Sequence, residues 1–241
     1  MKQFGIIGNP LEHSFSPSYF NSFFRENNIN AIYTPYQLQS IEQFPNLIEH
    51  NHFSGLNITA PYKETIIPYL DLLDPIAQEI GAVNTVQFSH AKLIGYNTDY
   101  LGFLATLNKA HLTDNTQALI LGTGGASKAI AYSLKLKNIP FETVSRKGLL
   151  NYNNLNKEII LNHLLIINCT PLGMYPLSNE FPPIPYQFLT PQHIAIDLIY
   201  NPSQTLFLKK AVAMKASTLN GYTMLITQAQ KAWNIWNQNT Y

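Results

Sequence analysis

Residues 119–130 contain the pattern that most restricts the fold of this chain. An apolar run, Leu119–Leu121, leads into a glycine-rich turn and then into a helix start made of small residues. This order is typical of the βα unit that binds a dinucleotide. Glycines at Gly122 and Gly124 permit a tight turn and a close approach to a pyrophosphate, whose negative charge is favoured at a helix N-terminus. The alternative is that the turn needs glycine for steric reasons alone.

The strand that we expect next, Phe141–Ser145, bears on which dinucleotide binds. In NAD-binding units an acidic residue about twenty positions after the glycine turn accepts the ribose 2′-hydroxyl. Here the segment ends in Ser145, Arg146 and Lys147, without an acid. A guanidinium beside a hydroxyl suits a 2′-phosphate, so the sequence favours NADP. The alternative is a solvated basic turn.

Strands and helices alternate through both halves of the chain, which predicts an α/β protein. Expected strands are 3–8, 31–37, 55–59, 82–88, 93–96, a strand from Gln117, 141–145, 164–168 and 193–198. Expected helices are 16–27, 41–50, one opened by Pro61, 99–110, one from the glycine turn to Lys137, and 224–237. Because the alternation restarts near residue 101, we predict two domains, 1–101 and 102–221, with a C-terminal helix, 222–241, that joins the first.

Composition limits the classes of partner. The 241 residues carry a formal net charge of +1 with 12% charged residues, which gives no basic field for nucleic acid and favours a small-molecule ligand. The 46% of hydrophobic residues are ample for buried cores. No stretch approaches the roughly 20 apolar residues of a membrane span, so we expect a cytoplasmic protein without membrane contact. The lone Cys169 is predicted to be a small buried hydrophobe, and no metal site is expected.

Polar residues gather where the strands of the first half end. Ser14 and Ser16 follow the first strand, Thr59 follows a later one, and Asn84 belongs to the same set. In open α/β folds ligands bind at such ends, although serines at a helix start are commonly caps and Ser16 before Pro17 fits that role. A lysine and an aspartate, Lys63 and Asp99, could carry acid–base chemistry if the fold brings them together, whereas taken singly each is an ordinary surface residue.

An ordered series of motifs resembles the shikimate dehydrogenase family over nearly the whole length. In the first half the series is Gly8–Pro10 with Ser14–Pro17, Gly55–Thr59 with Pro61–Lys63, Gly81–Thr85 and Gly95–Asp99. In the second half it is Gly122–Ala126, Asn168–Met174, Asp197–Pro202, and Gly221 with Met224, Leu225, Gln228 and Ala229. A single match would be weak, but the shared order is specific.

The resemblance implies NADPH-dependent, reversible reduction of 3-dehydroshikimate to shikimate, a step toward chorismate and the aromatic amino acids. It also implies two α/β domains with a cleft between them: an N-terminal substrate domain and a Rossmann-type NADP-binding domain. Lys63 and Asp99 would be the catalytic pair, with Lys63 transferring the proton. The substrate carboxylate would be held by Ser14, Ser16 and Tyr200, and the ring hydroxyls by Thr59, Asn84, Asp99 and Gln228. The cofactor would be bound by Gly122, Thr123, Gly124, Gly125, Ala126, Ser145, Arg146, Lys147, Leu198, Gly221 and Met224.

Two departures from the family pattern stand out. The family commonly has Asn-Arg-Thr where this chain has Ser145–Lys147, and the segment 148–163 is short for the family. We therefore predict a trimmed nucleotide-binding sheet, with 151–156 as a loop. Three alternatives remain open at this stage: a relative that prefers quinate or also uses NAD, a dinucleotide-binding regulator without catalysis, and a purely structural α/β protein. The sequence is compatible with a monomer and with a homodimer.

Overall fold

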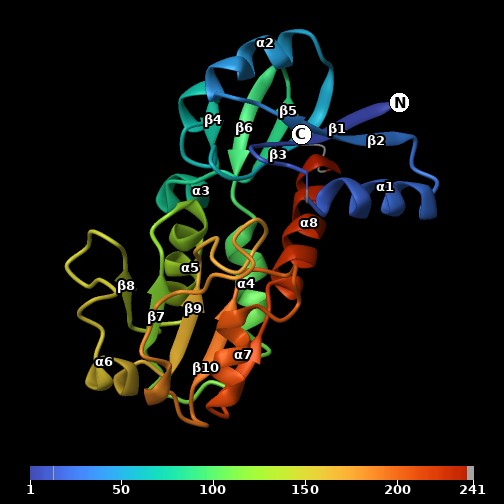
Figure 1. Ribbon diagram of the computed structural model, residues 1–241. Helices are drawn as coiled ribbons and strands as arrows, with labels where there is room; N and C mark the ends of the chain where they lie inside the picture. Colours follow the sequence, from blue (N-terminus) through green and yellow to red (C-terminus); the bar gives the residue numbers. More distant parts are fainter. Residues whose placement is uncertain (13, 238–241) are drawn as a thin grey trace. The chain divides into compact units, whose positions relative to one another are not determined.

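A computed structural model describes residues 1–12 and 14–237 (Figure 1). The chain divides into two compact units, Met1–Thr98 with Ala229–Tyr241, and Asp99–Gln228. Each unit contains its own sheet, one mixed and one parallel, so the predicted α/β class is confirmed. Asp99–Leu101 and residues 222–228, which we expected in the N-terminal domain, group with the second unit by their contacts. Residues 238–241 of the predicted last helix lie outside the described residues.

The sheet of the first unit has the strand order β2-β1-β3-β5-β6-β4. The strands β1, β2 and β3 are parallel, whereas β5 is antiparallel to β3 and to β6. Their bounds are β1 Lys2–Gly8, β2 Ala31–Gln37, β3 Phe53–Ile58, β4 Leu72–Leu73, β5 Thr85–Ser89 and β6 Lys92–Tyr96. The helices of this part of the chain are α1 Ser16–Glu26, η1 Ile41–Gln43, α2 Phe44–Glu49, η2 Ile67–Tyr69 and α3 Pro75–Ile80.

Both faces of this first sheet are covered. On one face α1 and the C-terminal turns of α8 (Tyr222–Asn237) form an aromatic core with β1, in which Phe4, Phe20 and Trp236 are buried. Figure 1 shows α1 and this end of α8 on the same side of the sheet. The other face packs an apolar cluster that includes Phe44 of α2 and Ile66. The carboxyl ends of β1 and β3, where the predicted substrate residues follow, lie at one edge because the two strands are parallel.

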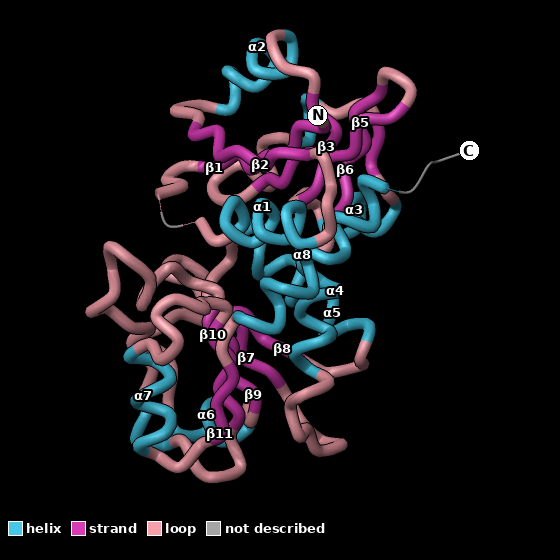
Figure 2. The backbone as a smooth tube through the Cα atoms, turned by 90° about the vertical axis from the view of Figure 1, so that its right-hand side faces the viewer, coloured by secondary structure: helices cyan, strands magenta, loops and turns pink. Residues whose placement is uncertain are grey.

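The second unit has a five-stranded parallel sheet within its described residues, in the order β11-β10-β9-β7-β8. The strands are β7 Ala118–Leu121, β8 Phe141–Val144, β9 Leu165–Asn168, β10 Ile194–Asp197 and β11 Ser217–Leu219. The helices are α4 Asp99–Leu107, α5 Gly125–Leu136, α6 Lys157–Asn162, η3 Tyr186–Phe188 and α7 Leu206–Ala213. Figure 2 shows α5 and α7 on opposite sides of the sheet, and each packs against its own apolar cluster.

This order is that of a doubly wound dinucleotide-binding sheet that lacks one edge strand. The common order is 3-2-1-4-5-6, in which the glycine turn follows strand 1. Here β7 takes the place of strand 1 and β8 that of strand 2, and β8 is the edge of the sheet. The segment after β8 is a loop up to the short helix α6. The predicted trimming and the predicted loop at 151–156 are therefore confirmed for the described residues.

Two local predictions were wrong. Pro61 does not open a helix: residues 61–66 form turns joined by hydrogen bonds such as Tyr62 N–H to the Thr59 carbonyl at 2.9 Å. Pro68 lacks an N–H group and disfavours α-helical geometry in the residue before it, so an α-helix that began at Pro61 could not continue through Pro68, and the short 3₁₀ helix η2 is found there instead. Ser16 is not the N-cap of α1, because Phe15 holds that position and makes no side-chain capping bond.

The helices were also searched for membrane spans. Across residues 1–12 and 14–237, none combines the length and apolar character needed to cross a membrane.

Candidate active site

The carboxyl ends of β1 and β3 bring together the first group of predicted substrate residues. The Thr59 amide donates to the Ile7 carbonyl at 2.8 Å, and the Asn9 amide donates to the Ala60 carbonyl at 3.0 Å. The loop that leaves β1 therefore runs beside the residue that leaves β3. Ser14 lies in this loop, and Ser16 is the first residue of α1. The structure thus gathers hydroxyl-bearing residues at one edge of the first sheet.

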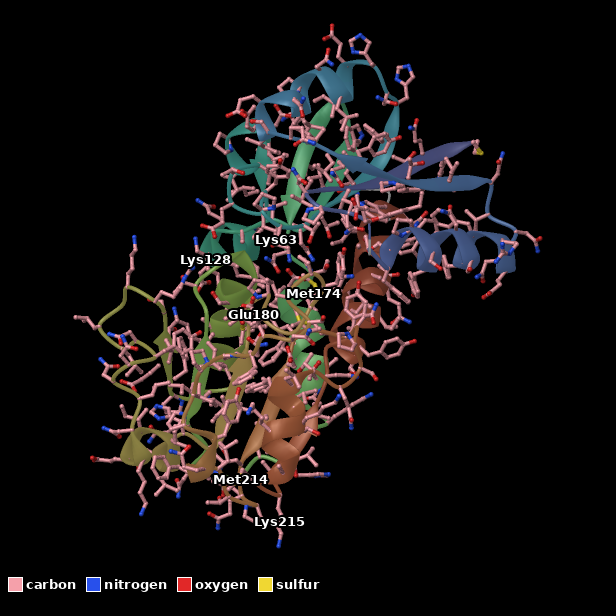
Figure 3. All side chains as sticks on the ribbon, in the orientation of Figure 1. Lys63, Lys128, Met174, Glu180, Met214 and Lys215 are labelled. Atoms are coloured by element: carbon pink, nitrogen blue, oxygen red, sulfur yellow. The ribbon has the colours of Figure 1, made fainter. Side chains whose placement is uncertain are left out.

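Lys63 lies in the turn that follows β3, close to the carboxyl end of β6 (Figure 3). Its backbone carbonyl accepts a hydrogen bond from the Val83 amide at 2.7 Å. This bond ties the turn of Lys63 to the segment that enters β5, one residue before Asn84. Lys63 is partly exposed, which suits a group that must exchange a proton with a ligand.

Asn84 is buried, and its side chain connects this segment to the end of the first unit. Its Oδ1 accepts from the Thr98 amide at 2.7 Å, and its Nδ2 donates to the Thr98 hydroxyl at 2.9 Å. Asp99 follows Thr98 directly and begins α4, where a carboxylate is favoured by the helix dipole. Asp99 is itself only 4% exposed, so it is not the ordinary surface residue of the alternative interpretation.

The predicted dinucleotide turn has the geometry that pyrophosphate binding needs. Gly122 has φ +110°, a conformation that side-chain-bearing residues rarely adopt. Gly124 is the N-cap of α5, and a Cβ added to it would meet nothing within 4 Å. Packing within the protein therefore does not require glycine at 124. Open space above a helix N-terminus is what a bound phosphate needs, so the residues present fit a dinucleotide.

The Arg146 segment lies beside this turn. The Gly122 amide donates to the Val144 carbonyl at 2.9 Å, so the residues that follow β7 and β8 leave the sheet side by side. Arg146 and Lys147 are exposed, and Ser145 is partly buried. The Ser145 amide donates to the Leu150 carbonyl at 3.2 Å, which closes a tight loop. Two cations and a hydroxyl thus stand at the sheet edge where an adenosine 2′-phosphate binds in such folds.

The middle of the same sheet edge is organised by a buried carboxylate, Asp197. Its oxygens accept hydrogen bonds from Asn168 Nδ2 at 3.0 Å, the Ile199 amide at 3.0 Å and the Thr205 hydroxyl at 2.5 Å. Burial raises the pKa of Asp197 to about 6, and these three hydrogen bonds oppose the rise. The carboxylate holds the loops that follow β9 and β10. Tyr200 belongs to the second of these loops.

The predicted nicotinamide-side residues also lie in the second unit. The Leu198 amide donates to the Asn168 carbonyl at 3.1 Å, and the Gly221 amide donates to the Ile199 carbonyl at 3.1 Å. Leu198 and Gly221 therefore belong to adjoining segments. Met224 is buried in the first turns of α8 and packs with the apolar cluster of α4 and α5.

Each unit thus gathers its own share of the predicted site residues. The first unit contains Ser14, Ser16, Thr59, Lys63 and Asn84. The second contains Asp99, Gly122–Ala126, Ser145–Lys147, Leu198, Tyr200, Gly221, Met224 and Gln228. Gln228 is on α8, where its Nε2 donates to the Leu225 carbonyl at 3.0 Å.

Several polar residues that support these groups were not among the site residues predicted from the sequence. Tyr33 and Asn57 form a buried hydrogen bond in the first unit, and Asn168, Asp197 and Thr205 form a buried network in the second. The sequence feature that could have revealed such residues is a polar residue at a strand position that faces the core. An apolar residue is the usual choice at such a position, so a polar residue there indicates a buried hydrogen bond.

Cys169 differs from its prediction, because it packs against an apolar cluster but is partly exposed. Burial of the sulfur still raises the pKa of the thiol, so the reactive thiolate is disfavoured. Among the described residues, no three His, Cys, Asp or Glu side chains are grouped as metal ligands.

Comparison with known proteins identifies the family. A family model for the shikimate dehydrogenase substrate binding domain matches residues 6–86. An NADP-dependent shikimate dehydrogenase of Desulforamulus reducens is 35% identical, over 96% of this chain and 88% of that protein. One from Methanococcus maripaludis strain C7 is 38% identical, over 98% and 91%.

Solved structures agree with the relatives. Shikimate dehydrogenase 1 from Peptoclostridium difficile is 37% identical and has a TM-score of 0.89, with 100% of this chain and 93% of that chain covered. Shikimate 5-dehydrogenase from Thermus thermophilus, in complex with NADP(H) and shikimate, is 30% identical with a TM-score of 0.87, over 98% and 94%. The sequence alignments with the relatives cover both units of this chain, and so do the structural alignments. This chain belongs to the shikimate dehydrogenase family.

Proposed function

We propose that this protein catalyses the reversible reduction of 3-dehydroshikimate by NADPH to shikimate. The observation that carries the proposal is the alignment of nearly the whole chain with NADP-dependent shikimate dehydrogenases. The local geometry supports it, because the residues of the family motifs follow the carboxyl ends of parallel strands in both units. We propose that the first unit binds the substrate and the second unit binds NADP.

A polyhydroxy acid matches the chemistry of the first unit. Ser14 and Ser16 provide hydroxyl donors for the carboxylate, and Thr59 and Asn84 provide partners for the ring hydroxyls. Tyr200 of the second unit is proposed as a further carboxylate donor. A buried polar group left without its partner is costly, so each of these bonds discriminates against a ligand that lacks the matching group.

Lys63 and Asp99 are proposed as the catalytic pair. During reduction, the Lys63 ammonium donates a proton to the substrate carbonyl oxygen as hydride reaches the carbonyl carbon. In the reverse direction, the Lys63 amine accepts the hydroxyl proton. The Asp99 carboxylate is proposed to accept a hydrogen bond from a substrate hydroxyl and so to fix the orientation of the ring. Orientation of this kind supplies much of the rate enhancement when the chemistry itself belongs to a cofactor.

The residues of the second unit fit NADP, and the cofactor supplies the hydride. The open N-terminus of α5 at Gly124 would receive the pyrophosphate, with Gly122, Thr123, Gly125 and Ala126 around it. Arg146 would bind the 2′-phosphate, with Ser145 and Lys147 beside it, because a guanidinium forms charge-assisted, bidentate hydrogen bonds to phosphate. Leu198, Gly221 and Met224 are proposed for the nicotinamide side, and Gln228 for a ring hydroxyl.

The test is a spectrophotometric assay that follows the near-ultraviolet absorbance of the reduced cofactor. Shikimate and quinate are each paired with NADP and with NAD. The proposal expects the fastest turnover with shikimate and NADP. Cofactor binding without turnover in any pairing would reject the enzyme function, and preference for quinate or NAD would reassign the specificity. Cytoplasmic location and the monomer or homodimer state stay predictions.

A further inference from the structure

A buried hydrogen-bonded array leads from Tyr33 to the proposed substrate residue Asn84 in the first unit. The Tyr33 hydroxyl donates to Asn57 Oδ1 at 2.7 Å. Tyr33 is 1% exposed, so water does not replace this partner. Tyr33 lies on β2 and Asn57 on β3, two strands separated by β1 in the sheet.

The array continues from Asn57 to Asn84. Asn57 Nδ2 donates to the Asn84 carbonyl at 3.1 Å and to the Thr85 hydroxyl at 3.3 Å. The Thr85 hydroxyl in turn donates to Asn84 Oδ1 at 3.1 Å. The Nδ2 group of Asn57 thus donates to Asn84 and to Thr85, the first residue of β5. The Oδ1 atom of Asn57 therefore faces Tyr33. The Tyr33 hydroxyl satisfies that oxygen and so fixes the orientation of the amide.

The backbone of Tyr33 is held independently of its hydroxyl. Asn21 of α1 donates from Nδ2 to the Tyr33 carbonyl at 2.8 Å and accepts from the Tyr33 amide at 2.9 Å. The ring of Tyr33 stacks on Phe20, with centroids 4.6 Å apart. Removal of the hydroxyl alone therefore leaves the helix that carries Ser16 attached to β2 and leaves the ring packed.

We propose that Tyr33 is a positioning residue for the substrate, whose hydroxyl fixes the Asn57 amide and through it keeps Asn84 in its binding orientation. The Asn57 amide holds both the Asn84 carbonyl and the Thr85 hydroxyl that donates to Asn84 Oδ1, so a change in its orientation is passed directly to Asn84. The inference rests on the proposed function, because it assumes that Asn84 binds the substrate.

The test is Tyr33→Phe in the full chain, assayed with shikimate and NADP. Loss of one buried hydrogen bond predicts a KM for shikimate about 3- to 10-fold higher. We expect kcat to stay within about twofold and the Kd of NADP, from NADPH fluorescence, to stay unchanged, because a positioning role acts on ground-state binding. Tyr36→Phe is the matched control, since Tyr36 lies on the same strand and its hydroxyl accepts from Gln3 Nε2 outside the array.

A second variant tests the same array from its other end. Thr85 is fully buried, and Thr85→Val removes the donor to Asn84 while keeping the side-chain shape. It is expected to raise the KM for shikimate and to leave kcat and NADP binding unchanged, whether or not Tyr33→Phe folds. Wild-type KM in both variants would overturn the positioning role, and so would a loss confined to kcat. Absence of turnover in the wild-type protein would instead overturn the proposed function, so the two failures are distinguishable.

Discussion

The carboxylate of Asp197 and the hydroxyl of Thr205 are joined by a hydrogen bond of 2.5 Å in the second unit, where Asp197 is completely buried. Thr205 is the N-cap of α7, and its hydroxyl also accepts from the Leu208 amide at 3.4 Å. The buried acid is thus connected through one hydroxyl to the start of a helix. Its protonation state therefore affects the stability of the whole sheet edge.

The first prediction concerns the pH dependence of stability. Burial raises the pKa of Asp197 from 3.8 to about 6, so its contribution to the free energy of unfolding is fully present below about pH 4 and is lost as the pH rises through 6. The two pKa units correspond to about 3 kcal/mol. Asp197→Asn cannot ionise, so urea unfolding from pH 4 to 7 should show the wild type losing this amount relative to the variant. Parallel stability curves would contradict the assignment, and Asp114→Asn, at an exposed position, is the control.

The second prediction separates the two glycines of the dinucleotide turn. Gly122→Ala should lower the free energy of unfolding by roughly 1–2 kcal/mol, because Gly122 has a positive φ. Gly124→Ala should change it by less than about 1 kcal/mol, since the added methyl group meets no protein atom. That methyl group would instead stand where the phosphate binds, and we expect NADP affinity to fall by at least ~10-fold. Denaturant unfolding and NADPH fluorescence measure the two effects. Normal NADP affinity in Gly124→Ala would reject the phosphate site.

The third prediction tests cofactor selectivity. Arg146→Ala should weaken NADP binding by about 10- to 100-fold, the range expected for loss of hydrogen bonds to a charged group. NAD binding should be unaffected, because NAD lacks the 2′-phosphate. Titration of both cofactors into the variant measures the ratio, with Lys157→Ala on an exposed part of α6 as the control. Equal losses for the two cofactors would mean that Arg146 supports the fold of the loop and does not recognise the phosphate.

The fourth prediction concerns proton transfer. Lys63→Ala should lower kcat by about 10²- to 10⁴-fold, the usual range for a general acid–base group. The KM for shikimate should change little, since the proposed role lies in the transition state. Steady-state kinetics beside Lys92→Ala, an exposed lysine on β6, measure both parameters. A variant whose defect is mainly in KM would show that Lys63 positions the substrate.

Much of the fold was predictable because short apolar runs mark the strands, and such a run can be recognised in the local sequence without knowledge of the strands that pair with it. β2 was predicted with its observed bounds, and the loop at 151–156 was predicted from its many asparagines. The short helices α3 and α7 were missed, since eight or fewer residues carry too little periodicity to distinguish a helix from a loop. The helix predicted from Pro61 was wrong, because an α-helix that began there could not continue through Pro68, seven residues further along the chain.

The site was predictable only in part, because some of its contacts depend on how the strands pair in the folded sheet. Motif residues such as Ser14 and Thr59 are recognisable because they lie in segments that follow strands, and the order of strands along the chain already marks those segments. The bond between Tyr33 and Asn57 joins residues 24 positions apart on strands that are not neighbours in the sheet. Such a pair depends on the register of β1 with both strands, and register is a property of the folded sheet.

The path of α8 has a consequence for how the protein is made. Its first residues, up to Gln228, belong to the second unit, whereas Ala229, Ala232 and Trp236 complete the aromatic core of the first. The Trp236 indole also donates to the Val86 carbonyl at 3.0 Å. The ribosome synthesises the chain from its N-terminus, so the first unit lacks this part of its aromatic core until Ala229, Ala232 and Trp236 have been made. That core therefore cannot be complete before every residue of the second unit has been synthesised.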